Sequence, residues 1–189
     1  MTPLDVCRRT LENTQQVINR VSPEDLVRLT PCCDWDVRAL VNHMIGVLDA
    51  LEAPARGEQV DFSASGSEDV IGSDPAGTFS KNASGFMAAW SAPGATERVV
   101  TSMFGEQPAA FYLGLATADI LLHGWDLATA IGAPYTMDET TSAEVLANMQ
   151  RMLKPEMRGE GKAFASEATC ASDASVQERL VAFSGRSSR

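Results

Sequence analysis

Basic residues are scarce in this sequence. The 189 residues include 15 lysines and arginines against 25 aspartates and glutamates, which gives a formal net charge of −10. No lysine- or arginine-rich run offsets this charge, so the surface would repel the phosphates of nucleic acids and of anionic membranes. We therefore expect no nucleic acid and no membrane as a partner, and the composition favours a small molecule.

Segments that direct a chain into or across a membrane are also lacking. The N-terminal residues MTPLDVCRRTLENT carry charges throughout and have no long apolar core, unlike a signal peptide. Residues 111–132 form the most apolar long stretch, but Asp119, His123 and Asp126 interrupt it, and such groups are costly inside a bilayer. We expect this stretch to be a buried bundle helix of a cytoplasmic protein.

Several common functional motifs are missing. The four cysteines, Cys7, Cys32, Cys33 and Cys170, include no CxxC pair, so they match neither a zinc knuckle nor a redox motif. We expect reduced and partly buried thiols. The sequence contains no GxSxG element, P-loop or dinucleotide fingerprint, which leaves hydrolase, nucleotide-binding and Rossmann functions without their signatures.

Helical periodicity dominates what is present. Apolar residues recur at steps of three and four, and proline or glycine ends most of these runs. With so little strand pattern, we expect an all-α protein built as an antiparallel four-helix bundle with short additional helices. The predicted helices cover residues 4–21, 37–51, 75–90, 109–131, 138–153 and 175–183, with a turn or short helix at 22–29.

The connecting segments carry their own predictions. Asp34 is a natural N-cap for the second helix, and Asp34 and Asp36 both place charge favourably at its start. Residues 54–77 are rich in Gly, Ser, Asp and Glu and predict a loop with local mobility or an active-site flap. The β-branched run at 98–104 predicts a short strand or an extended connection. We expect a single domain, 1–189, in which 133–189 is a C-terminal helical extension.

The only two histidines, His43 and His123, both lie within predicted helices. Asp119 lies four residues before His123 and therefore on the same helix face, and Asp126 continues that face. An Asp–His pair with a histidine from a facing helix forms a three-ligand metal site with open positions. A hydrogen-bonded Asp119–His123 pair beside a satisfied core histidine is the alternative, and spacing alone leaves both open.

Two motifs add a resemblance. TPCCDWDVRALVNHMIG resembles the signature TPCPDWDVRALVNH, and DILLHGWDLATAIG resembles HGWDLARATG. Both signatures belong to an actinobacterial family of metal-binding proteins in the DinB-like superfamily, which includes the N-terminal domain of mycothiol-dependent maleylpyruvate isomerase. The ending QERLVAFSGR is similar to that family's DRLLAFLGR. Cys33 stands where the signature has Pro.

The resemblance implies a DinB-like four-helix bundle that holds a divalent metal, zinc first and nickel second. It places His43 and His123 among the ligands, with Asp119 where the isomerase domain often has Glu. Outside the ligands, we expect Asp126 to orient a histidine and Trp125 to lie beside it. Trp35 and Trp125 are packing residues or pocket walls, and Arg38 and Arg98 are solvated or contact an anion.

The implied activity is that of a metal-dependent thiol transferase or isomerase-like enzyme. A small thiol such as mycothiol would be activated at the metal and would attack an electrophilic substrate. A non-catalytic metal-binding bundle and a metal-dependent hydrolase are the alternatives. The isomerase has an additional C-terminal domain for which this sequence is too short, so we do not expect maleylpyruvate isomerisation itself. Related bundles often pair, which makes a homodimer a further prediction.

Overall fold

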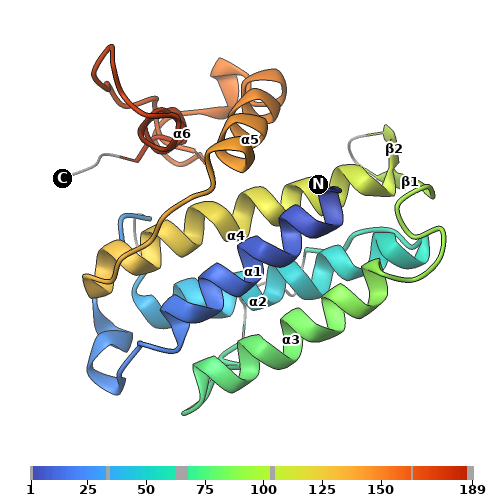
Figure 1. Ribbon diagram of the computed structural model, residues 1–189, viewed down its shortest axis with the longest axis horizontal. Coiled ribbons are helices and arrows are strands. Elements are labelled where there is room, and N and C mark those ends of the chain that lie inside the picture. Colours follow the sequence, from blue (N-terminus) through green and yellow to red (C-terminus); the bar gives the residue numbers. More distant parts are fainter. Residues whose placement is uncertain (1, 33–34, 63–67, 103–104, 163, 187–189) are drawn as a thin grey trace. The chain divides into compact units, whose positions relative to one another are not determined.

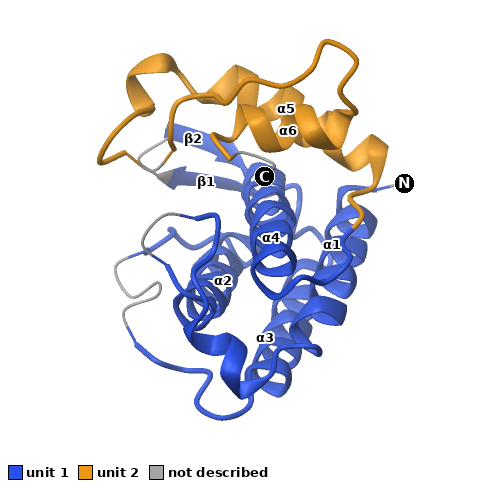
Figure 2. Cartoon of the chain, turned by 90° about the vertical axis from the view of Figure 1, so that its left-hand side faces the viewer, with its two compact units in different colours: residues 1–135 blue, residues 136–189 orange. Residues whose placement is uncertain are grey.

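The computed structural model describes residues 2–32, 35–62, 68–102, 105–162 and 164–186. The chain divides into two compact units, Met1–Tyr135 and Thr136–Arg189 (Figure 2). The division falls close to residue 133, where the C-terminal extension is predicted to begin, and the single-domain assignment stays a prediction. The six α-helices of the described residues are α1 (Pro3–Ile18), α2 (Val37–Glu52), α3 (Pro75–Trp90), α4 (Ala109–Ile131), α5 (Glu139–Met152) and α6 (Val176–Phe183).

Local side-chain contacts fix where the helices of the first unit begin. Thr2 and Asp5 form a reciprocal capping box at the start of α1. The Asp36 carboxylate accepts a hydrogen bond from the backbone N–H of Ala39 at the start of α2. Asp36 is therefore the N-cap, and Asp34, the predicted cap, lies outside the described residues. At the C-terminal end of α4, Gly132 adopts the left-handed conformation that ends the helix.

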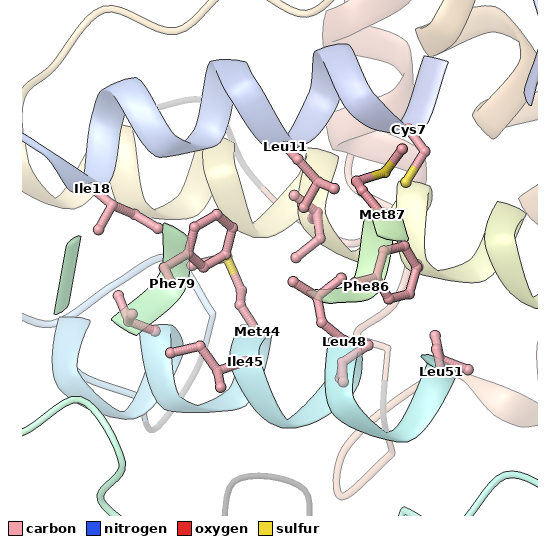
Figure 3. Close-up of a cluster of buried hydrophobic side chains, with 14 of the residues drawn as sticks. Cys7, Leu11, Ile18, Met44, Ile45, Leu48, Leu51, Phe79, Phe86 and Met87 are labelled. Atoms are coloured by element: carbon pink, nitrogen blue, oxygen red, sulfur yellow. The ribbon is translucent and has the colours of Figure 1, made fainter. Parts of the chain in front are cut away.

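Helices α1 to α4 form the four-helix bundle that the sequence predicts (Figure 1). Apolar side chains of α1, α2 and α3 point into a shared core (Figure 3), and those of α4 complete it. Trp90 is fully buried, and its indole N–H donates to the carbonyl oxygen of Leu51, so its one polar atom is satisfied. The largest fully buried side chains of the described chain include Trp90, Tyr112, Phe79, Phe86, Ile18, Leu40, Met44 and Leu48.

No helix in the described ranges has both the length and the apolar character needed to cross a bilayer. This includes α4, the most apolar long stretch of the sequence, whose polar residues interrupt its apolar run.

A small hairpin precedes α4. Strand β1 (Val99–Ser102) pairs antiparallel with β2 (Gly105–Pro108). The described residues of the segment 98–104 thus contain the expected short strand, and residues 103–104 lie outside the described ranges. The second strand is not anticipated, because its sequence GEQP has low strand propensity and predicts a turn. Its pairing with β1 is a tertiary contact that local propensity does not report.

The described part of the segment between α2 and α3 contains a short helix and side-chain hydrogen bonds to α2. A 3₁₀ helix at Ala53–Arg56 continues from α2. Further along, the side-chain oxygen of buried Asn42 accepts hydrogen bonds from the backbone N–H groups of Val70 and Ile71. Residues 68–72 are thereby fastened to α2. Residues 63–67 lie outside the described ranges, so the prediction of an active-site flap stays a prediction.

The second unit contains α5, a short 3₁₀ helix (Pro155–Met157) and α6. Ser175 and Glu178 form a capping box that starts α6. The Arg158 guanidinium lies 4.3 Å from the centre of the Phe183 ring, a cation–π contact that ties the segment after α5 to α6. The predicted terminal helices are both present.

Candidate metal centre

The three predicted ligands lie together where α2 faces α4. His43 Nε2 is 3.2 Å from Asp119 Oδ1, and His123 Nε2 is 3.4 Å from the same oxygen. One donor atom from each of the three side chains lies within 4.8 Å of the other two, so a single cation placed among them is within reach of all. Asp119 and His123 lie one turn apart on α4, and the packing of α2 against α4 brings His43 next to them.

Asp119 carries the clearest sign that the cluster suits a cation. Its Oδ2 atom is buried and has no hydrogen-bond partner among the described residues. A buried carboxylate oxygen in that state is costly, and a cation would satisfy it. Burial by itself raises the pKa of Asp119, but the charges and hydrogen bonds of His123 and then His43 outweigh it and hold that pKa below its ordinary value. The carboxyl group is thus kept in the form that binds metals, and the nitrogen–oxygen–nitrogen set suits zinc or nickel.

Asp126 contacts one of the histidines. Its Oδ2 lies 2.9 Å from His123 Nδ1, and its side chain is fully buried. Because a carboxylate only accepts, Asp126 favours a proton on His123 Nδ1, which leaves Nε2, 3.4 Å from Asp119 Oδ1, as the nitrogen available to a metal. The sequence analysis gives Asp126 this role, and the contact it requires is present.

The aromatic residue beside the histidines is Trp35. The centre of its indole ring lies 4.4 Å from that of the His43 ring and 5.7 Å from that of His123. Trp125, which the sequence analysis places next to Asp126, follows His123 by two residues. Two residues turn a helix by about 200°, so the side chain of Trp125 leaves α4 on the opposite side from His123.

A short turn before α2 positions Trp35 and brings a residue that the ligand prediction omits. The backbone N–H of Thr30 donates to the carbonyl of Trp35, and that of Trp35 donates to Cys32. Cys32 offers a sulfur within 4.8 Å of donor atoms of His123 and Asp126. The spacing of Cys32 from α4 in the sequence gives no hint of this contact. Its presence in the same signature as Trp35 and His43 is the only available signal.

The two candidate anion-binding arginines bond within the protein. Arg38 Nη1 forms an ion pair with Asp69, 2.7 Å away. Arg98 Nη1 donates to the carbonyl oxygen of Ala55 at 2.5 Å. Both therefore hold the segments around α2 in place, and we assign neither to the metal centre.

Comparisons with known proteins show the family of this chain. The sequence profile of the mycothiol maleylpyruvate isomerase N-terminal domain matches residues 7–128. Two uncharacterised proteins of Mycobacterium tuberculosis, from strains CDC 1551 and H37Rv, are each 31% identical to the chain over the full length of both sequences.

Among solved structures, mycothiol-dependent maleylpyruvate isomerase matches with a TM-score of 0.63 and 17% identity, over 77% of this chain and 66% of the isomerase chain. A histidine-to-alanine variant of that enzyme matches with the same TM-score and coverage at 16% identity. This chain thus aligns with slightly less than two thirds of the isomerase, and the likeness establishes the fold. From the profile and the full-length relatives together, the chain belongs to the mycothiol maleylpyruvate isomerase N-terminal domain family.

Proposed function

We propose that this protein binds one divalent metal ion through His43, Asp119 and His123 and activates a small thiol of the mycothiol class for attack on an electrophile. The observation that carries the proposal is the Asp119 carboxylate of the described bundle, whose Oδ1 lies near one nitrogen of His43 and one of His123 and whose buried Oδ2 has no hydrogen-bond partner. Zinc fits this donor set best, and nickel is the second choice.

The chain's own residues account for binding and orientation. His43 and His123 present nitrogens from facing helices, and Asp119 adds a carboxylate between them. Asp126 keeps the His123 lone pair directed at the cluster. When bound, the metal would supply a Lewis-acid centre that favours the ionised form of a thiol. Three protein ligands leave a coordination position for that thiol, as in catalytic rather than structural zinc sites.

The class of thiol is inferred from the family to which the chain belongs. The solved relative is named as mycothiol-dependent, and this chain belongs to the family of its N-terminal domain. We therefore propose a thiol of the same class for this chain. We do not propose maleylpyruvate as its substrate, because the alignment omits about a third of the isomerase chain. The electrophile is therefore proposed only as a class, a carbon centre open to addition or displacement by a thiolate.

Cobalt(II) substitution tests both halves of this proposal. Cobalt takes the place of zinc at such ligands and gives visible absorption that reports its coordination. The titration is best done in a Cys32→Ser background, so that the neighbouring thiol of the chain does not contribute sulfur bands. We expect one equivalent of cobalt to bind and mycothiol to add a sulfur-to-cobalt charge-transfer band.

Matched variants separate the possible results. His43→Ala and Asp119→Ala should lose the cobalt spectrum, and Glu12→Gln, an exposed change on α1, should keep it. Cobalt binding without any response to mycothiol would contradict the thiol-transfer half and leave a metal-binding bundle. Unchanged cobalt binding in His43→Ala would contradict the site.

A further inference from the structure

A second group of metal-capable side chains lies beside the first. Cys32, His123 and Asp126 each offer a donor atom, and these atoms lie within 4.8 Å of one another. The His123 side chain is 9% exposed and that of Asp126 is fully buried, while Cys32 is half-buried and present as a thiol. The group therefore opens towards the surface on the cysteine side only.

The distances inside this group suit a cation. Two ligands that each lie about 2.0–2.2 Å from a metal, at an angle of roughly 90–110°, are separated by about 3 Å. His123 Nδ1 and Asp126 Oδ2 are 2.9 Å apart. The same spacing serves their hydrogen bond, so a cation would compete with the proton for these two atoms.

Hydrogen bonds hold the backbone groups of Cys32 itself. The hydroxyl of Thr30 donates to the Cys32 carbonyl at 3.1 Å and accepts from the Cys32 N–H at 3.2 Å. The N–H of Trp35 also donates to the Cys32 carbonyl, at 3.2 Å. Because these bonds restrain the Cys32 backbone, less conformational entropy is lost when the sulfur binds.

We propose that Cys32, His123 and Asp126 form a second cation site, which prefers thiophilic ions such as Cd²⁺. Its thiolate distinguishes it chemically from the first site, which contains only nitrogen and oxygen donors. On binding, the Cys32 thiol releases its proton to solvent and the sulfur takes up the metal, with no change of oxidation state. The site stands apart from thiol transfer, and its existence does not require that chemistry.

The two sites compete for His123. A neutral imidazole has one nitrogen lone pair, and the other nitrogen carries the proton. A metal held with Asp119 uses Nε2 and leaves the proton on Nδ1, towards Asp126. A metal held with Cys32 uses Nδ1 and leaves the proton on Nε2, towards Asp119. The chain therefore holds one ion at a time, and a thiophilic ion in the second site would displace the metal from the first.

Cadmium titration followed by ultraviolet absorption tests the proposal, because a thiolate–cadmium bond gives a charge-transfer band. We expect the band to grow to one equivalent in the full chain and to be lost in Cys32→Ser. Cys33→Ser, Cys7→Ser and Cys170→Ser should each keep it. A band that survives Cys32→Ser, or that disappears with Cys33→Ser instead, would overturn the assignment, as would the absence of any band.

Further variants distinguish this proposal from the first. His43→Ala removes a ligand of the first site only, so it should lose cobalt bound there and keep the cadmium band. Cys32→Ser should lose the cadmium band and keep cobalt at the first site. Asp126→Ala is a second test in case Cys32→Ser folds poorly, because it removes a different donor of the same site. A cadmium band of undiminished intensity in Asp126→Ala would contradict the three-donor site. Thermal melts of each apo variant check that the bundle is intact.

Discussion

The Nδ1 atom of His123 lies 2.9 Å from Oδ2 of Asp126, one turn further along α4. This contact ties the orientation of a proposed ligand to a residue that does not bind the first metal. Both proposed sites involve it, because the first site keeps this hydrogen bond and the second replaces it with a metal.

Asp126→Asn tests that dependence. An amide keeps the shape of the carboxylate but can present its NH₂ group to Nδ1, which favours the wrong tautomer. We expect zinc affinity to fall by about 10- to 100-fold, the range typical for loss of such a partner. Competition with a chromophoric chelator measures it, with Glu12→Gln as the matched control. Affinity equal to that of the unaltered chain would show that Asp126 does not set the orientation.

Trp35 should report metal binding by fluorescence. Its indole lies against both histidine rings, whereas Trp125 leaves α4 on the other side and Trp90 is buried in the core. We expect Trp35→Phe to remove most of the zinc-induced change in tryptophan emission, and Trp125→Phe to retain it. If Trp125→Phe removes the change instead, Trp125 and not Trp35 is the tryptophan that responds to the metal.

Gly124 should be intolerant of a side chain. A Cβ at this position would lie 2.5 Å from both the Thr14 hydroxyl and the Tyr135 hydroxyl, which pack over α4. Overpacking of this kind costs about 1–3 kcal/mol, so Gly124→Ala should lower the free energy of unfolding by that amount. Gly114→Ala, on the same helix with no atom within 4 Å of the new Cβ, should be neutral or stabilising by up to about 1 kcal/mol. Equal effects of the two substitutions in urea unfolding would contradict the close approach.

Cys7 gives the fold a dependence on alkaline pH. Burial raises the pKa of this thiol from 9.0 to about 11, although a hydrogen bond with Thr117 and the charge of Arg8 lower it in part. Above pH 9 the unfolded chain ionises first, so stability present below pH 9 is lost as the pH rises through the folded value. The loss is on the order of 2–3 kcal/mol, at about 1.4 kcal/mol per pKa unit.

The matching measurement is the free energy of unfolding at neutral and at alkaline pH, for the unaltered chain and for Cys7→Ala. The substitution creates a small cavity at both pH values, so the difference between them is the relevant quantity. We expect that difference to be smaller in Cys7→Ala. An identical pH dependence would show that the Cys7 thiol ionises as readily in the fold as in the unfolded chain.

The sequence predicts the helices well because each has a strong periodic pattern and a clear terminal signal, such as Gly132 after α4. It also predicts the juxtaposition of His43, Asp119 and His123, since two lie one turn apart and the family signature supplies the third. Strand β2 and the approach of Cys32 to α4 are not predictable in this way. Both arise from contacts between segments far apart in the chain, which neither propensity nor spacing contains. A cytoplasmic location and a homodimer stay predictions.

The affinity of the purified chain for zinc, measured by chelator competition for the unaltered protein and for His123→Ala, tests the central claim most directly. His123 belongs to both proposed sites, so its removal should eliminate tight binding. We expect one zinc ion per unaltered chain and a loss of affinity in His123→Ala greater than the roughly 100-fold limit for an outer partner. Zinc bound by His123→Ala as tightly as by the unaltered chain would contradict the account.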